Sequence, residues 1–422
     1  MVSTAEQDRK ARAVPPALAD ELLIDAEVDD VPAPATPLKA GWLLVVSLVL
    51  IALNLRPALS SLGPVLKEII ADTGISAGTA SLLTTAPVVC LGLFGVLAPR
   101  ISRRLGTERA ILALLLVLAL GTALRGLGTT PALLLGAVLA GAGIGVTNVL
   151  LPGIVKRDFP DKAALMTGVY TMALCAGAAI AAGSTLPLAR AADGSWATAL
   201  AFWAIPAIIA AVVWLTQIPP RHGPAAHAGF TVRGLWTDPL AWQVTLFMGL
   251  QSSLAYSVFG WGAKILQDRG LDVPSSGLML GLSILVQGAG AQVAPLLASK
   301  TGDLRFSALL MLAFGLAGLF GYLFAPMGLM WLCSVVLGIG QGGAFAVALT
   351  MIAQRGGNPE TAARLSGMTQ SVGYVMGALA GPLAVGLVHD SFGGWPPVAV
   401  LFTIITLGAA FCALGAGRVR TV

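Results

Sequence analysis

Charged residues are scarce in this sequence. They make up 11 % of the 422 residues, whereas about a quarter of the residues in a soluble globular domain are charged, and 56 % of the residues here are hydrophobic. This balance excludes a soluble domain and predicts a protein that crosses a membrane many times. Glycine is abundant instead, with 51 residues, which is typical of membrane helices that pack closely through small side chains.

Cysteine is also rare. The four cysteines, Cys90, Cys175, Cys333 and Cys412, lie singly in apolar segments, and no pair has the spacing of a metal site or a redox motif. We therefore expect no metal and no cofactor. The glycine-rich run at 141–145 does not indicate a nucleotide site, because it lies inside a predicted membrane helix with no strand before it.

Acidic residues are missing from the middle of every predicted span. All twenty lie in the N-terminal tail, in loops or at the ends of helices, which disfavours a proton relay built on a buried carboxylate. An enzyme is the least favoured class, because no nucleophile, base and orienting group are placed together.

Apolar segments of about 20 residues follow one another along the chain and predict twelve spans. Their ranges are 41–66, 78–98, 109–127, 131–155, 163–188, 197–217, 240–266, 276–299, 305–325, 328–354, 362–388 and 396–415. The predicted organisation is a disordered cytoplasmic tail (1–40), an N-terminal six-helix bundle (41–217), a central cytoplasmic loop (218–239), a C-terminal six-helix bundle (240–415) and a cytoplasmic tail (416–422).

The two predicted bundles are related in sequence. A shift of 199 residues aligns Gly141 with Gly340 and Pro160 with Pro359, and it also aligns Gly63 with Gly262. One constant offset in several helices predicts two parallel pseudo-repeats in an all-α membrane protein, with a substrate site near the midplane between them.

The basic residues are sorted by loop. With alternate loops assigned to the cytoplasm, 19 of the 25 lysines and arginines lie on that side, five lie on the other side, and Arg56 lies within a span. This bias predicts cytoplasmic termini in a cell membrane and explains the net charge of +5 without nucleic acid. The expected partners are the lipid bilayer and a small-molecule substrate, and we expect a monomer.

Arg56 is the residue around which the predicted function is built. The nearest carboxylate in the sequence is Glu68, about 18 Å further along a helix, and holding a guanidinium at mid-bilayer depth costs on the order of 3 kcal/mol. We expect Arg56 to line a polar cavity and to bind a small planar or anionic ligand. In the alternative interpretation, carbonyls of helices broken at Pro57 and Pro64 satisfy it.

Other polar side chains at membrane depth are neutral, so they can donate to an anion without adding charge. With Arg56, the predicted substrate-binding residues are Asn54, Asn148, Tyr170, Gln251, Tyr256, Gln287, Gln341, Gln370 and Tyr374. A hydrogen bond between packed helices remains the alternative for each of them.

Two loops resemble the loop that follows the second helix in the major facilitator superfamily, although the early acid of that motif is missing here. They run from Pro99 to Arg109 and from Ser299 to Arg305. The resemblance implies a latch between the cytoplasmic ends of the two halves, and simple positive-inside topology is the alternative. The predicted latch residues are Arg100, Arg103, Arg104, Lys156, Arg157, Asp158, Lys300 and Asp303.

The runs Asn54 to Pro57, Asn148 to Pro160 and Met166 to Thr171 together resemble the cyanate permease and 2-nitroimidazole transporter branch of that superfamily. The resemblance implies a secondary active transporter of a small planar anion or weak acid, cyanate-like or nitro-heterocycle-like, that works by alternating access. An exporter of neutral drug-like heterocycles is the first alternative, and a non-transporting membrane sensor is the second.

Overall fold

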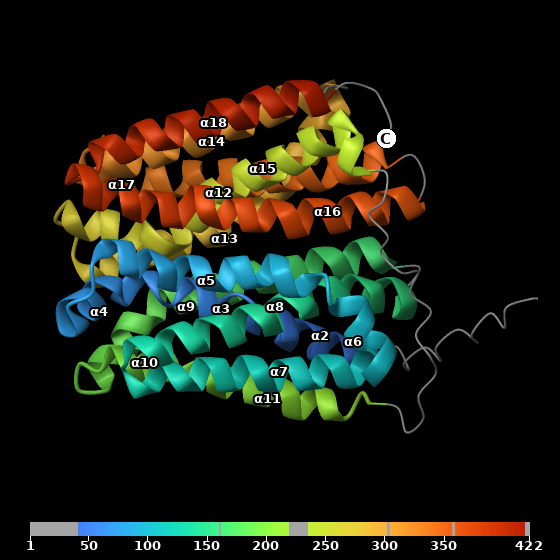
Figure 1. Cartoon of the computed structure of the whole chain (residues 1–422), viewed down its shortest axis with the longest axis horizontal. Helices are drawn as coiled ribbons and strands as arrows, with labels where there is room; N and C mark the ends of the chain where they lie inside the picture. Colours follow the sequence, from blue (N-terminus) through green and yellow to red (C-terminus); the bar gives the residue numbers. More distant parts are fainter. Residues whose placement is uncertain (1–40, 160–161, 219–234, 302–303, 357–358, 418–422) are drawn as a thin grey trace, which may run out of the picture.

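The computed structural model describes residues 41–159, 162–218, 235–301, 304–356 and 359–417. Most of these residues lie in helices, which run along the long axis of the molecule and form two bundles, one above the other in Figure 1. The predicted tail 1–40, most of the predicted central loop and residues 418–422 lie outside the described residues.

The first bundle contains six spans, several of them built from more than one helix. Its helices are α2 (Trp42–Asn54), α3 (Pro57–Ser60), η1 (Gly63–Val65), α4 (Leu66–Thr73), α5 (Ala77–Gly95), α6 (Ala98–Leu105), α7 (Thr107–Leu124), η2 (Arg125–Leu127), α8 (Thr130–Asp158), α9 (Ala163–Ala191), α10 (Trp196–Phe202) and α11 (Ala204–Leu215).

The second bundle repeats this arrangement. After η4 (Leu235–Thr237) it contains α12 (Pro239–Asp268), α13 (Val273–Thr301), α14 (Leu304–Phe324), η5 (Met327–Leu329), α15 (Met330–Arg355), α16 (Pro359–Ala378), η6 (Leu379–Leu383), α17 (Ala384–Phe392) and α18 (Pro396–Ala416). Adding 199 to the bounds of α8 gives 329–357, which overlaps α15, and adding it to α7 gives 306–323, which overlaps α14. The predicted all-α fold with two pseudo-repeats is confirmed.

Eleven of the spans among the described residues are long and apolar enough to cross a membrane by length and composition alone. The twelfth predicted span is α12, a helix of 30 residues. It contains polar residues such as Gln251, Ser252, Ser253 and Ser257, and all four are buried inside the protein. Its lower hydropathy therefore reflects a central position rather than a failure to span.

The first span is broken at Arg56. Proline lacks a backbone N–H and disfavours helical geometry in the residue before it, so α2 ends at Asn54 and α3 begins at Pro57. Arg56 has φ −114° and ψ −24° and lies at the break. A second proline, Pro64, lies in the tight turn η1 before the chain continues as α4. The break places Arg56 partway along the span.

The two ends of the molecule are distinguished by the helix termini that lie there, and we call them the terminal end and the far end. The terminal end holds Trp42, Leu215, Pro239 and Ala416, and the far end holds Thr73, Ala191, Asp268 and Phe392. In Figure 1 the far end, with α4, α10 and α17, is on the left.

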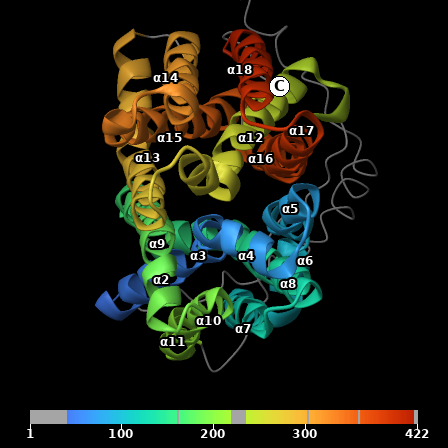
Figure 2. The same cartoon turned by 90° about the vertical axis from the view of Figure 1, so that its left-hand side faces the viewer.

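The bundles pack against each other through α9 with α13 and through α5 with α16 and α17, as Figure 2 also shows. Glycines allow this approach. A Cβ atom on Gly281 would lie 2.9 Å from the backbone oxygen of Ala179, and one on Gly92 would lie 2.6 Å from that of Ser371. Small residues thus hold the two halves close together, as in other membrane helix pairs.

Candidate functional site

Arg56 faces the second bundle from the break in the first span. The carbon at the centre of its guanidinium lies 5.6 Å from the centre of the Phe259 ring on α12, and the side chain is partly buried. Within the described part of the chain, Arg56 makes no ion pair and no side-chain hydrogen bond. A cation–π contact of this kind contributes about 0.5–2 kcal/mol, which does not replace the hydrogen bonds that a guanidinium loses when it leaves water.

Two tyrosines of the second bundle lie close to Arg56. The rings of Tyr256 on α12 and Tyr374 on α16 meet edge to face, with centres 6.0 Å apart and planes at 79°. Tyr256 also lies 6.1 Å from Phe259, and the charge of Arg56 acts on both tyrosines. The structure therefore brings together an arginine of one bundle and an aromatic cluster of the other.

Five of the six predicted amide residues have partners within the protein. Gln287 Nε2 donates to Gln341 Oε1 at 3.0 Å, and Gln341 Nε2 donates to the carbonyl of Leu254 at 3.3 Å. Both side chains thus join α12, α13 and α15 within the second bundle.

Three further amides are satisfied locally or between helices. Gln251 donates to Ser252 Oγ at 2.8 Å, and Gln370 donates to Ser366 Oγ at 2.8 Å. Asn54 donates to the carbonyl of Leu50 at 2.8 Å and to that of Pro206 on α11 at 3.2 Å. Of these bonds, only the one from Asn54 to Pro206 joins two helices, and the others lie within a single helix.

Asn148 on α8 and Tyr170 on α9 differ from the amides above. Both are partly buried, and neither side chain makes a hydrogen bond to a described residue. Tyr170 lies near Tyr374 and so beside the aromatic cluster. Cys175, one turn and a half along α9, also lies near the charge of Arg56, although its single position in the sequence pointed only to packing.

The predicted latch residues that the structure describes lie at the terminal end of the first bundle. Arg157 pairs with Glu108 at 2.7 Å and with Asp158 at 2.8 Å, so it joins α8 to the start of α7. Burial lowers the pKa of Arg157, but its hydrogen bonds to Asp158 and Glu108 outweigh burial and place that pKa above its usual value. Glu108 lies in the predicted loop from Pro99 to Arg109 but was not among the predicted latch residues.

The other predicted latch residues fall into two groups. Arg100, Arg103 and Arg104 lie on α6, and their side chains are exposed. Asp303 and the side chains of Lys156 and Lys300 lie outside what the structure describes.

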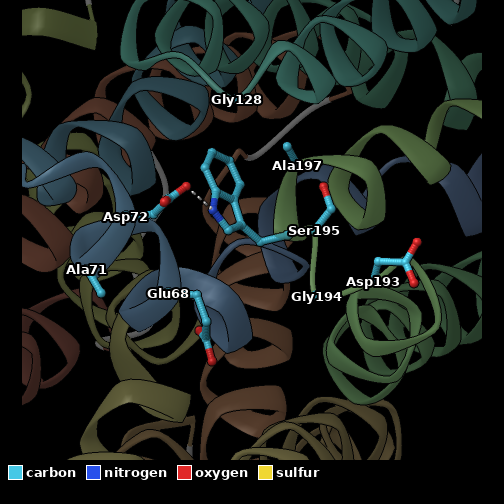
Figure 3. Close-up of a pocket in the computed structure, with 9 residues that line it drawn as sticks. Glu68, Ala71, Asp72, Gly128, Asp193, Gly194, Ser195 and Ala197 are labelled. Atoms are coloured by element: carbon cyan, nitrogen blue, oxygen red, sulfur yellow. Dashed lines mark hydrogen bonds between the residues drawn. The ribbon is translucent and has the colours of Figure 1, made fainter.

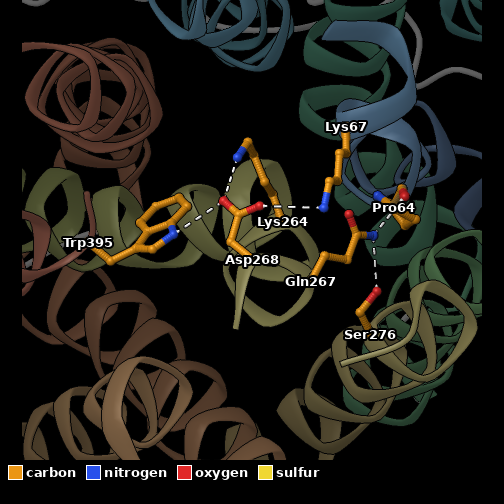
Figure 4. A network of polar contacts seen from close by, with 7 residues as sticks. All are labelled: Pro64, Lys67, Lys264, Gln267, Asp268, Ser276 and Trp395. Carbon is orange, nitrogen blue, oxygen red and sulfur yellow. Dashed lines mark hydrogen bonds and ion pairs between the residues drawn. The ribbon is translucent and has the colours of Figure 1, made fainter. Parts of the chain in front are cut away.

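A polar cluster that the sequence did not predict lies at the far end (Figure 4). Asp268 on α12 accepts from Lys264 Nζ at 2.5 Å and from Trp395 Nε1 at 3.3 Å, and it lies 3.9 Å from Lys67 on α4. Lys67 belongs to the first bundle, so this ion pair crosses between the bundles.

Two more polar contacts cross between the bundles at the far end. Gln267 Nε2 donates to the carbonyl of Pro64 at 3.1 Å, and the backbone N–H of Gly78 donates to Asp390 Oδ2 at 2.7 Å. Among contacts between described residues, these two and the Lys67–Asp268 pair are the polar contacts that join the bundles. We call Lys67, Asp268, Gln267, Pro64, Gly78 and Asp390 the far-end latch.

A family model supplies the identification. The model described as Major Facilitator Superfamily matches residues 43–380 and, in a second match, 245–420. The chain belongs to the major facilitator superfamily.

Relatives in this superfamily match over nearly their whole length. The uncharacterized transporter YycB of Bacillus subtilis (strain 168) is 36 % identical over 91 % of this chain and 96 % of that protein. The 2-nitroimidazole transporter of Escherichia coli (strain K12) is 34 % identical over 91 % and 98 %, and the cyanate transport protein CynX of the same strain is 33 % identical over 83 % and 91 %. The predicted branch of the superfamily is confirmed.

A solved structure shows the same fold. A bacterial homologue of the human lysosomal transporter Spinster, in an inward-facing and unoccupied conformation, matches with a TM-score of 0.71 at 17 % identity, over 90 % of this chain and 98 % of that chain. This likeness confirms the fold, and the family match and the relatives make the chain a multi-pass membrane transporter of the major facilitator superfamily.

This transporter also has a cleft of about 590 Å³ at the far end of its first bundle (Figure 3). The cleft is lined by Glu68, Asp72, Asp193 and Trp196, and Trp196 Nε1 donates to Asp72 Oδ2 at 3.0 Å. Its three carboxylates repel an anion, and its lining includes none of the predicted substrate-binding residues. The cleft is therefore separate from the site around Arg56.

Proposed function

We propose that this major facilitator protein is a secondary active transporter of a small planar anion or weak acid, cyanate-like or nitro-heterocycle-like, which binds at Arg56. The observation that carries the proposal is the charge of Arg56, which lies between the bundles with no counter-ion among the described residues. A bound anion would supply that counter-ion. The names of two relatives, a 2-nitroimidazole transporter and a cyanate transport protein, support the same ligand class.

The rest of the predicted site is part of the proposal. Asn148, Tyr170, Tyr256 and Tyr374 have no hydrogen-bond partner among the described residues, so they are free to bind substrate beside Arg56. The amides that already have partners in the protein would have to exchange those partners for substrate; they are Asn54, Gln251, Gln287, Gln341 and Gln370.

The mechanism we propose is alternating access, with the terminal end in the cytoplasm. The charge bias of the loops supports that orientation. The far-end latch holds the two bundles together on the opposite side of the membrane, so this conformation corresponds to a transporter closed to the outside. The terminal-end residues of the predicted latch would engage in the opposite conformation.

The far-end latch predicts a modest effect of Asp268→Asn. An ion pair between partly exposed groups contributes about 0.2–1 kcal/mol, so loss of Lys67–Asp268 should shift the conformational equilibrium by about 1.4- to fivefold. Ser61 is buried at the end of α3, so a cysteine introduced there and labelled with a membrane-impermeant maleimide from outside reports that shift as a reaction faster by about the same factor.

Asp272→Asn is the matched control for that experiment. Asp272 is exposed, its pKa is lowered by hydrogen bonds from Ser275, and it does not take part in the far-end latch. The control should label at the parent rate. Equal rates for Asp268→Asn and the parent would show that the latch does not bias the transporter.

The experiment that tests the proposed function is a thermal-shift screen of the purified protein. The ligands are cyanate, nitrate, nitrite, bicarbonate and 2-nitroimidazole. A ligand at 100 times its dissociation constant should add about 2.7 kcal/mol of stability. Stabilisation by at least one of these five compounds is expected, and no response to any of them would contradict the proposal.

A further inference from the structure

We infer that Tyr256 and Tyr374 are specificity-determining residues of the transport site, and that they select a planar ligand with acceptor atoms at both ends. Arg56 would bind one end from the first bundle, and the two tyrosine hydroxyls would bind the other from the second bundle. The inference rests on the proposed function, because it assigns the second half of the same site.

The first argument is the state of the two hydroxyls. Both side chains are largely buried, with Tyr256 7 % and Tyr374 9 % exposed, and neither hydroxyl makes a hydrogen bond to a described residue. Neither hydroxyl oxygen is among the fully enclosed side-chain atoms that lack a partner, so both oxygens remain accessible. Two accessible, unpaired hydroxyls on one aromatic pair can donate to a ligand.

A comparison with the remaining buried tyrosine of this bundle strengthens that argument. Tyr322 is fully buried, and its hydroxyl bonds to Ser334 Oγ at 2.9 Å and to the carbonyl of Met279 at 3.1 Å. The second bundle therefore does satisfy a tyrosine hydroxyl where the role is structural. Tyr256 and Tyr374, beside Arg56, have accessible hydroxyls with no such partner among the described residues.

The second argument is the chemistry of the donors. A guanidinium has donors only, and a tyrosine hydroxyl beside it donates most favourably to an anionic acceptor. Gln287 and Gln341, whose amides also carry acceptor oxygens, are bonded to each other. A ligand with acceptor atoms toward Arg56 and toward the tyrosines would therefore be favoured over a ligand with donors at those positions. Cyanate, with its nitrogen and oxygen, and 2-nitroimidazole, with its ring nitrogen and nitro group, both fit that description.

The third argument is shape. The rings of Phe259, Tyr256 and Tyr374 lie in a series with centres 6.1 Å and 6.0 Å apart and planes inclined at 39° and 79°, beside the guanidinium of Arg56. A planar ligand can pack against a single ring face or against the guanidinium plane. A ligand that touches both bundles would also draw them together, which links its recognition to the conformational change.

The test measures equilibrium binding of cyanate, 2-nitroimidazole and imidazole to the purified full chain and to Tyr256→Phe, Tyr374→Phe and Tyr322→Phe. Imidazole lacks the nitro group, so it serves as the ligand without the acceptor atoms at one of the two ends. Tyr256→Phe and Tyr374→Phe should each bind cyanate or 2-nitroimidazole, whichever the parent binds, about ten- to a hundredfold more weakly than the parent does. Each variant loses one hydrogen bond to a charged acceptor. Neither should lower the unfolding temperature, since no internal hydrogen bond is lost.

Tyr322→Phe is the matched control, and it should behave in the opposite way. It loses two internal hydrogen bonds, so its unfolding temperature should fall while its affinity for the ligand stays at the parent value. Parent affinity in both Tyr256→Phe and Tyr374→Phe, with loss of binding in Arg56→Gln, would overturn the inference and leave the proposed function intact. Binding of neither cyanate nor 2-nitroimidazole to the parent would overturn the inference outright.

Discussion

Replacing Arg56 with glutamine is expected to reduce anion affinity at least a hundredfold. The substitution removes a charged two-pronged donor, and two hydrogen bonds to an anion contribute about 3 kcal/mol or more, with each 1.4 kcal/mol equal to a factor of ten. The unliganded variant should be as stable as the parent or more stable, because it no longer holds an uncompensated charge at membrane depth. Equilibrium binding and thermal unfolding of the same preparations measure both effects.

Arg56→Lys is the control that separates charge from geometry. It keeps the positive charge and loses the planar fork, so its anion affinity should fall between those of the parent and Arg56→Gln. Arg56→Gln that binds anions like the parent, or that unfolds at a much lower temperature, would show that Arg56 supports the broken helix rather than the ligand.

Replacing Gly63 with leucine is expected to reduce transport at least tenfold by keeping the far end open. A Cβ atom on Gly63 would lie 2.5 Å from the backbone oxygen of Phe259 and 3.3 Å from that of Gly260, both on α12. Backbone atoms of a packed helix cannot move aside as a flexible side chain can, so the leucine should force η1 and α12 apart. The effect is steric, and it should exceed that of removing the weak Lys67–Asp268 pair.

Gly168→Leu is the matched control for that substitution. A Cβ atom on Gly168 meets no other atom within 4 Å, so a leucine there adds the same side chain to the first bundle without a clash. Faster labelling of a cysteine at Ser61 from outside is expected for Gly63→Leu and parent labelling for Gly168→Leu. Normal transport by Gly63→Leu would show that the far end need not close at this contact.

The fold could be predicted from the sequence because its main signals can be recognised without knowing which residues are in contact in the folded protein. Apolar segments of membrane length give the number of spans, and the 199-residue offset relates the two bundles. Pro57 and Pro64 mark the breaks in the first span where they occur. Even α12, the most polar span, follows from its length and from its counterpart in the first repeat.

The isolation of Arg56 could also be predicted, because no acidic residue is near it in the sequence. The pairing of the amides could not. Gln287 and Gln341 are 54 positions apart, and their contact depends on how α13 and α15 are turned about their axes. The same limit hid the far-end latch, because Lys67 and Asp268 are ordinary loop-end charges until the two bundles bring them together.

Exchange transport in liposomes tests the central claim most directly. Liposomes that contain the protein are loaded with unlabelled cyanate or 2-nitroimidazole, and the uptake of the labelled compound is followed. We predict that the parent accumulates label above protein-free liposomes and that Arg56→Gln does not. Equal accumulation by the parent and Arg56→Gln would contradict the claim that Arg56 binds the transported anion.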